Sequence, residues 1–149
     1  MYEKILVAGW GDMDFNSHMR NTAYLDKSAD VRMMYFSSCG FTMSEFMRLR
    51  LGPVVMKDEV EYFKEFHLLD EIRAQLSLAG LSEDGSRMIL RNEFYRKDVL
   101  AARVTSTAGW LDLTQRKLTV PPPELLKPLK ELARSADFRV LDGSVRSQG

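Results

Sequence analysis

The chain has 149 residues, of which 45% are hydrophobic and 28% are charged, a composition typical of one globular domain. Lysine plus arginine and aspartate plus glutamate are equal at 21 each, so no net charge attracts nucleic acid, and we expect no nucleic-acid partner. The single cysteine, Cys39, excludes an internal disulfide, and no apolar run reaches the ~18 residues of a membrane span. The N-terminus lacks the pattern of a secretory signal, so the expected location is the cytoplasm.

The first part of the chain predicts one strand and two helices. Residues 2–11 are apolar and partly β-branched, as in a strand. After a loop rich in Gly, Asp, Asn and Ser, the apolar spacing predicts a long helix that runs to about residue 38, with Asn21 or Thr22 as its N-cap. The broad apolar stripe of this helix indicates that it is mostly enclosed. Residues 42–50 begin with capping-box spacing and predict a short second helix.

From Val54 onward the hydrophobic period changes to two, which predicts four successive strands joined by short turns, an antiparallel meander. The polar segment 82–86 contains Asp-Gly and is typical of a hairpin turn. Three prolines then stop further pairing, and residues 124–133 predict a short helix. We expect a single domain over residues 1–137 and a weakly ordered tail over residues 138–149.

One strand, a long helix and four further strands indicate an α+β fold in which a curved antiparallel sheet of about five strands covers the helix. The second face of such a sheet has limited cover, which favours dimerisation. The apolar residues predicted to be available for that second face are Leu81, Leu100, Val104 and Trp110.

Polar residues crowd just ahead of the long helix. Asp12, Asp14, His18 and Asn21 fall within ten positions. The N-terminus of a helix presents unpaired N–H groups and a partial positive charge, so the pattern suggests a site built on that end. Asp12 is expected to hold the loop by accepting backbone N–H bonds. The other histidine, His67, lacks ligand spacing to His18, so no metal site is expected.

The stretch GDMDFNSHMRNTAY resembles the D-x-D-x-x-G-H-V-N-N-x-x-Y signature of hotdog-fold acyl-CoA thioesterases, the 4-hydroxybenzoyl-CoA thioesterase-like group. The matching residues are Asp12, Asp14, His18, Asn21 and Tyr24, and Leu25, Asp30 and Arg32 extend the match into the helix. The stretch VEYFKEFHLLDEI resembles the second signature of the family through Tyr62, Asp70 and Glu71. The chain departs from the two signatures at Ser17, Arg20, Glu65 and Leu69.

This resemblance implies a hotdog fold and hydrolysis of an acyl-CoA thioester to the free acid and CoA. Asp14 matches the catalytic carboxylate and would act as the nucleophile or as the general base for water. The backbone N–H of Asn21 would polarise the thioester carbonyl. Contacts with the substrate are expected from His18, Tyr24, Lys57, Tyr62 and Lys64.

Coenzyme A is part of the implied substrate, so no separate cofactor is expected. The implied assembly is a homodimer or homotetramer, because the site of such a protein lies near the subunit interface. Two alternatives remain open: a non-catalytic hotdog protein that binds acyl thioesters or lipid, and a hotdog dehydratase.

Overall fold

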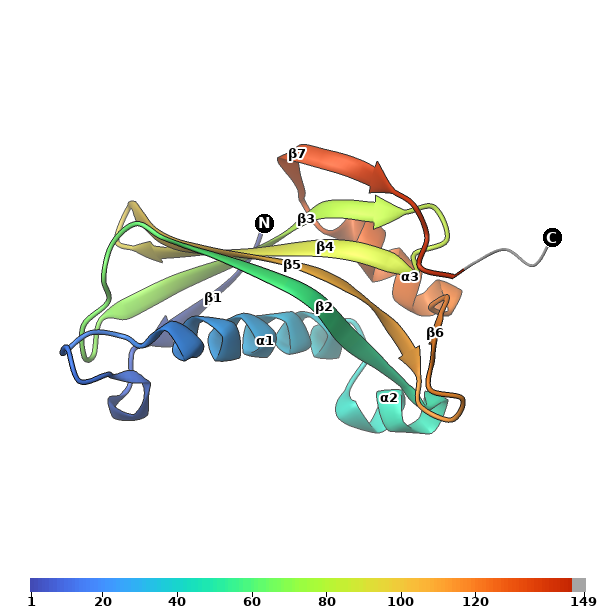
Figure 1. Cartoon of the computed structure of the whole chain (residues 1–149), viewed down its shortest axis with the longest axis horizontal. Coiled ribbons are helices and arrows are strands. Elements are labelled where there is room, and N and C mark those ends of the chain that lie inside the picture. Colours follow the sequence, from blue (N-terminus) through green and yellow to red (C-terminus); the bar gives the residue numbers. More distant parts are fainter. Residues whose placement is uncertain (146–149) are drawn as a thin grey trace.

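The computed structural model describes residues 1–145 and shows a curved sheet wrapped around a long helix (Figure 1). The main strand order is β1-β3-β4-β5-β2, and all neighbours in it are antiparallel. The five strands are β1 (Tyr2–Val7), β2 (Leu51–Tyr62), β3 (Glu71–Ser82), β4 (Arg87–Arg96) and β5 (Val99–Asp112). The expected α+β hotdog arrangement is therefore confirmed.

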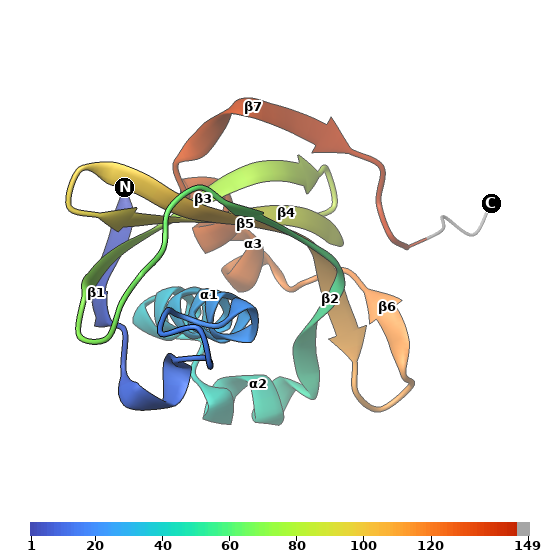
Figure 2. The ribbon, with the colours of Figure 1, turned by 60° about the vertical axis from the view of Figure 1, so that its left-hand side comes forward.

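Three α-helices accompany the sheet within residues 1–145, namely α1 (Asn21–Ser38), α2 (Met43–Leu49) and α3 (Pro123–Glu131). A view close to the axis of α1 shows the sheet arching over it (Figure 2). In the described part of the chain, none of these helices is both long and apolar enough to cross a bilayer.

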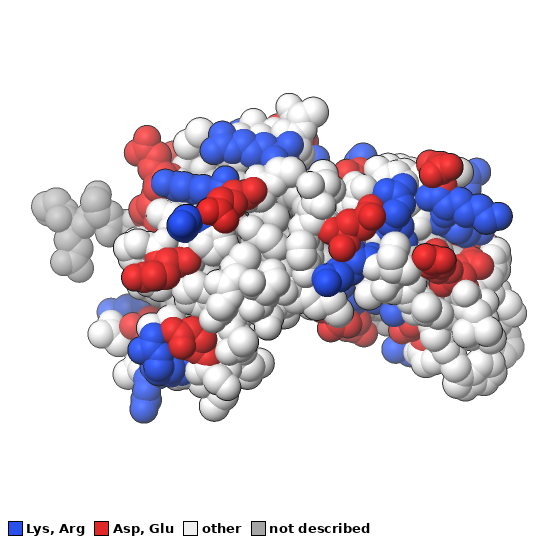
Figure 3. Space-filling view, turned by 180° about the vertical axis from the view of Figure 1, so that it is seen from behind, with Lys and Arg blue, Asp and Glu red and all other residues white. Residues whose placement is uncertain are grey.

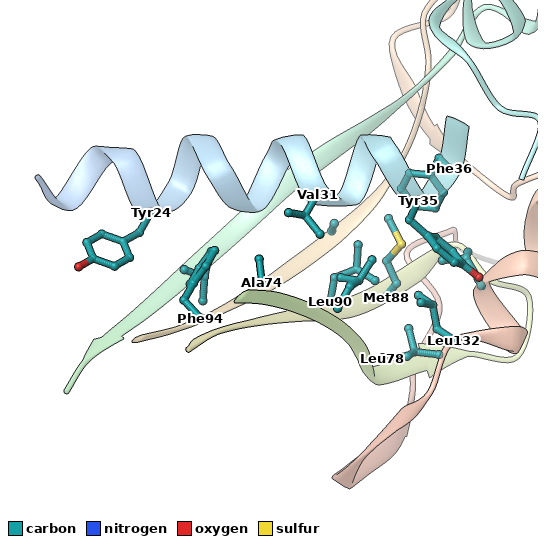
Figure 4. Packing of buried hydrophobic residues seen from close by; sticks show 14 of the residues in the cluster. Tyr24, Val31, Tyr35, Phe36, Ala74, Leu78, Met88, Leu90, Phe94 and Leu132 are labelled. Carbon is teal, nitrogen blue, oxygen red and sulfur yellow. The ribbon is translucent and has the colours of Figure 1, made fainter. Parts of the chain in front are cut away.

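The core lies between α1 and the concave face of the sheet. Tyr24, Val31, Tyr35 and Phe36 of α1 are buried, and Tyr24 and Val31 point toward the strands (Figure 4). The sheet residues buried against them include Ala74, Leu78, Met88, Leu90, Phe94 and Trp110. Burial of each large side chain stabilises the fold by roughly 1.5–3 kcal/mol, which fixes α1 and its N-terminal end against the sheet.

The start of α1 differs from the sequence-based expectation. The N-cap is Arg20, whose side chain makes no capping bond, and Asn21 is the first helical residue. Neither predicted N-cap residue occupies the capping position, so side-chain chemistry does not set this boundary. The prediction for α2 holds, because Thr42 is its N-cap and accepts the N–H of Glu45.

The convex face of the sheet is not apolar, which corrects one expectation. Val104 and Trp110 are fully buried because alternate residues of β5 from Ala102 to Trp110 face α1. Leu81 also returns to the core, because a register shift between Leu78 and Gly80 reverses the alternation in β3. Leu81, Val104 and Trp110 are therefore not available to a partner on the convex face. The fourth residue of that expectation, Leu100, is half-buried.

Two further strands pair with members of the five-stranded order. β6 (Lys117–Thr119) pairs with the end of β5, and β7 (Arg134–Leu141) runs parallel to the second half of β3. The expected boundary at residue 137 is therefore wrong, since it falls inside β7. The guanidinium of Arg91 holds both carboxylate oxygens of Asp137 at 2.7 and 3.1 Å, which ties β7 to the sheet. Of the predicted tail, residues 146–149 lie outside the described residues.

Candidate active site

The loop between β1 and α1 is anchored by Asp12 at the end of a 3-10 turn, η1 (Trp10–Asp12). Its Oδ2 atom accepts the N–H of Gly9 at 2.8 Å and lies 2.9 Å from the ammonium of Lys27. Burial opposes ionisation of this carboxyl, but the bonds from Lys27 and Gly9 outweigh burial and hold its pKa below the ordinary value. Asp12 therefore has the loop-holding role that the sequence predicts.

Asp14 lies in a tight turn that orients its carboxylate. Its N–H donates to the carbonyl of His18 at 2.9 Å, and its Oδ1 atom accepts the N–H of Asn16 at 2.8 Å. Ser17 has a φ of 67°, in the left-handed region that favours the glycine of the family signature. The Nδ1 atom of His18 lies 3.6 Å from the second oxygen, Oδ2. One oxygen of Asp14 is thus fixed by the main chain, and the other faces the imidazole.

The imidazole of His18 lies between two carboxylates. Its Nε2 atom is 3.9 Å from an oxygen of Glu65, on the side away from Asp14. Its Nδ1 atom is also 3.4 Å from the carbonyl of Met19, so the ring is oriented by groups on both of its edges. His18 is therefore placed to position Asp14 and to contact a ligand.

The N-terminus of α1 opens beside these residues. Asn21 is the first helical residue, so its N–H has no acceptor within the helix. The side-chain oxygen of Asn21 accepts the N–H of Thr22 at 3.0 Å and so caps the next donor. The N–H of Asn21 remains directed toward the space ahead of the helix, where the helix dipole adds a partial positive charge.

A cleft of about 400 Å³ brings the predicted residues together. Six of the seven predicted site residues line it: Asp14, His18, Asn21, Tyr24, Tyr62 and Lys64. The seventh, Lys57, does not, because it projects from the convex side of β2 and pairs with Glu59 at 2.8 Å. The chain folds so that the loop, the start of α1 and the end of β2 meet at one place.

Aromatic rings form the apolar wall of this cleft. Tyr24 is buried, and its ring meets that of Tyr62 edge to face with centroids 5.1 Å apart. Burial raises the pKa of Tyr24 to about 12, and burial also raises the pKa of Tyr62. Both hydroxyls therefore stay protonated at neutral pH and can donate hydrogen bonds.

Other lining residues were not predicted from the sequence. They are Met19, Phe63 and Glu65. Glu65 occupies a position where the family signature has proline, so the resemblance to the family does not indicate a carboxylate there. The alternation of β2 could not have indicated Phe63, because consecutive strand residues face opposite sides and Phe63 reaches the cleft only because the strand ends at Tyr62. In the described range, no group of three or more His, Cys, Asp and Glu side chains is arranged to hold a metal ion.

Comparison with known proteins identifies the family. The sequence model of the thioesterase-like superfamily matches residues 8–129, which include the loop, α1 and four of the five main strands, β2 to β5, whereas β1 precedes the matched range. No curated protein matches the chain significantly.

Solved structures share the fold at low sequence identity. A Staphylococcus aureus protein in complex with CoA has a TM-score of 0.79 at 18% identity and covers 87% of this chain and 81% of its own. A 1,4-dihydroxy-2-naphthoyl-CoA thioesterase from Synechocystis has a TM-score of 0.77 at 14% identity, with 88% and 96% covered. A gentisyl-coenzyme A thioesterase has a TM-score of 0.76 at 14% identity, with 85% and 98% covered. The family match spans most of the chain, so the chain belongs to the thioesterase-like superfamily and is by family a thioester hydrolase.

Proposed function

We propose that this chain is an acyl-CoA thioesterase that hydrolyses R–CO–S–CoA to the free acid and CoA. The observation that carries the proposal is that the carboxylate of Asp14 and the first residue of α1, Asn21, line the same cleft. A nucleophile or base and a carbonyl-polarising donor are the groups that thioester hydrolysis requires. Coenzyme A then enters as part of the substrate, and no separate cofactor takes part.

The chemistry divides between two residues. The carboxylate of Asp14 either attacks the thioester carbon, forming an acyl anhydride that water cleaves, or removes a proton from a water that attacks it. In both routes negative charge develops on the carbonyl oxygen, and the N–H of Asn21 stabilises it. Such a fixed donor contributes roughly 3–4 kcal/mol of transition-state stabilisation. The C–S bond then breaks, and CoA leaves as the thiol after protonation.

A panel of acyl-CoAs tests the proposal through release of free thiol. Asp14→Asn is expected to lower kcat by at least about 100-fold, since it removes the nucleophile or base. The matched control is Asp30→Asn, a carboxylate exposed on α1 that does not line the cleft, and we expect its rate to equal that of the wild type. Equal thiol release in the wild type and Asp14→Asn would overturn the assignment.

The same panel separates the alternatives. Tight binding of acyl-CoA without thiol release in the wild type indicates a binding protein. Hydration or dehydration of the acyl group without thiol release indicates a dehydratase. Neither outcome is expected, because Asp14 lies with its carboxylate held by the main chain beside a helix N-terminus.

A single turnover in H₂¹⁸O distinguishes the two roles of Asp14. In the nucleophile route, water that attacks the Asp14 carbonyl of the anhydride leaves ¹⁸O in that side chain. In the base route all of the label enters the free acid, as it also does when water attacks the acyl carbonyl of the anhydride, so ¹⁸O in Asp14 is the result that demonstrates the nucleophile route. Mass spectrometry of the peptide that contains residue 14 reads the difference.

We further propose that two copies pair along β2. This strand is the last in the main sheet order, and an unpaired edge of 12 residues is a template for pairing with another chain. Tyr62 and Phe63, at its end, line the cleft, so a second copy along β2 would border the site.

Light scattering at micromolar concentration tests this assembly. Val55→Lys places a charge on β2 and is expected to shift the dimer to a monomer. Val99→Lys is the matched control, because both valines are 48% exposed but Val99 lies in β5 beside a hairpin turn. A wild-type monomer, or an equal effect of both variants, would contradict pairing along β2.

A further inference from the structure

A second hollow lies on the other side of Asp14. It has a volume of about 430 Å³ and is lined by Trp10, Met13, Asp14, Ser17 and Leu68. Asp14 is the one residue that lines both this hollow and the cleft described above. The carboxylate proposed to act on the thioester therefore borders two cavities.

The two cavities differ in chemistry. The first cleft combines its aromatic wall with the charged or polar side chains of Lys64, Glu65 and His18. The second hollow has large apolar side chains, and Asp14 is its one ionisable lining residue. Trp10 is 83% exposed, and uncharged residues cover the corner of the molecule formed by the η1 loop (Figure 3). Apolar surface of this kind gains free energy when a ligand covers it.

The walls of the hollow are built from fixed backbone. Met13 bridges to Met19 across the loop, and Ser17 closes the tight turn after Asp14. On the opposite side, the N–H of Leu69 donates to the carbonyl of Ala8 at 2.7 Å, which holds the turn that carries Leu68. The backbone that carries the lining side chains is thus held in place by its own hydrogen bonds.

We propose that this second hollow receives the acyl group of the thioester, while the CoA arm lies in the first cleft along Lys64, the cation that its phosphates would meet. The inference rests on the proposed function, since it assigns the two parts of that substrate to the two sides of Asp14. The thioester carbon then sits at the junction, within reach of the carboxylate. Apolar acyl groups larger than acetyl, straight-chain or aromatic, are the substrate class that the lining side chains select.

A series of straight-chain acyl-CoAs from acetyl to decanoyl tests the assignment. Each methylene transferred to an apolar site is expected to raise kcat/KM about fourfold until the hollow is full. Trp10→Ala and Leu68→Ala remove apolar walls, so the ratio of octanoyl-CoA to acetyl-CoA kcat/KM is expected to fall at least tenfold. Phe15→Ala is the matched control: it lies in the same loop, is fully exposed and lines neither cavity, so its ratio should equal that of the wild type.

The outcomes separate this inference from the proposed function. If the wild type releases thiol and Asp14→Asn does not, but Trp10→Ala keeps the wild-type ratio, the hollow is not the acyl site although the enzyme assignment stands. A Trp10→Ala protein that changes oligomeric state with an unchanged ratio assigns Trp10 to a subunit contact and likewise overturns the inference.

S-alkyl-CoA thioethers keep the inference testable if no acyl-CoA is hydrolysed. These ligands cannot be cleaved, so calorimetry measures binding alone. Affinity that rises with alkyl length in the wild type but not in Trp10→Ala supports the hollow as the apolar subsite. Equal length dependence in the two proteins overturns it.

Discussion

Two charged groups of this fold, Asp14 just ahead of α1 and Arg32 in the middle of that helix, differ in their access to water. At the N-terminal end, the side chains of Asp14 and His18 are 28% and 30% exposed and border two cavities. Three turns further along, Arg32 points into the core and is 7% exposed.

The guanidinium of Arg32 makes two hydrogen bonds to buried side chains. The Nε atom of Arg32 donates to Asn92 and an Nη atom donates to the hydroxyl of Ser106, both at 2.8 Å. The Ser106 hydroxyl in turn donates to Asp58 on β2, and the Asn92 amide donates to the carbonyl of Gln75 at 3.3 Å. Helix α1 is thereby tied to four strands through one guanidinium.

Burial lowers the pKa of Arg32 to about 10, against the opposing effect of the Asp58 carboxylate. The guanidinium therefore keeps its charge at neutral pH and needs its partners. The comparison with Asp14 shows what separates a structural from a functional polar group in this fold: the partners of Arg32 are internal and buried, whereas an oxygen of Asp14 is left beside open space.

Arg32→Met is expected to have the largest effect on stability. The change leaves Asn92, Ser106 and Asp58 without their cation, and breaking a buried charged network of this kind costs about 3–5 kcal/mol. We expect that loss in the free energy of unfolding, measured by urea denaturation, with kcat per folded molecule close to that of the wild type. Asp14→Asn should show the reverse, with unfolding free energy within about 1 kcal/mol of the wild type. Equal losses of unfolding free energy in both variants would contradict the distinction between a structural Arg32 and a functional Asp14.

A second contrast lies between two buried tyrosine hydroxyls. The hydroxyl of Tyr35 donates to the carbonyl of Pro128 at 2.5 Å and joins α1 to α3, whereas the hydroxyl of Tyr2 is buried without a partner among the described residues. Tyr35→Phe is expected to lower the free energy of unfolding by about 1–2 kcal/mol, because it leaves a buried carbonyl unpaired.

Tyr2→Phe is the matched control, since the two rings pack against each other with centroids 5.0 Å apart. Removing a hydroxyl that has no partner should leave stability unchanged or raise it. Thermal or urea unfolding of the two variants compares them directly, and a larger loss for Tyr2→Phe would contradict this assignment of hydrogen bonds.

The residues around Asp14 were more predictable from the sequence than the buried partners of Arg32. The residues that form the loop and the start of α1 are neighbours in the chain, so Asp14, His18, Asn21 and Tyr24 come together by local structure alone. The partners of Arg32 lie 60 and 74 positions away, and the sequence shows Asp30 and Arg32 only as an extension of the family match into the helix. Asp30 is exposed, but strand register decides where Arg32 goes.

Irregular sheet geometry accounts for the remaining differences. A register shift between Val55 and Lys57 breaks the alternation predicted from Val54 onward, so that Asp58 and Val60 lie opposite core residues of β5 while Lys57 faces the convex side. Lys57 misses the cleft because residues 57–62 pair regularly with β5, so Lys57 and Tyr62 face opposite sides of β2. Strand β7 escaped prediction because its parallel pairing with β3 depends on tertiary contacts, among them the Arg91–Asp137 ion pair.

Asp12 is intermediate between Asp14 and Arg32, because its carboxylate is 24% exposed but is paired with Lys27. The depressed pKa of Asp12 means that the folded state favours the ionised form, so the charge stabilises the fold above the ordinary pKa of 3.8 and this contribution disappears as the pH falls through the folded-state value. Asp12→Asn keeps an oxygen that can accept the N–H of Gly9, so it tests the charge alone. We expect it to lose roughly 0.5–1 kcal/mol of unfolding free energy at pH 7, with the difference from the wild type closing below about pH 4.

Lys27→Met should show the same pH dependence, and the double variant should lose little more than either single one, because both changes remove the same ion pair. A difference that stays constant from pH 7 to pH 3 would mean that Asp12 holds the loop by shape and not by charge.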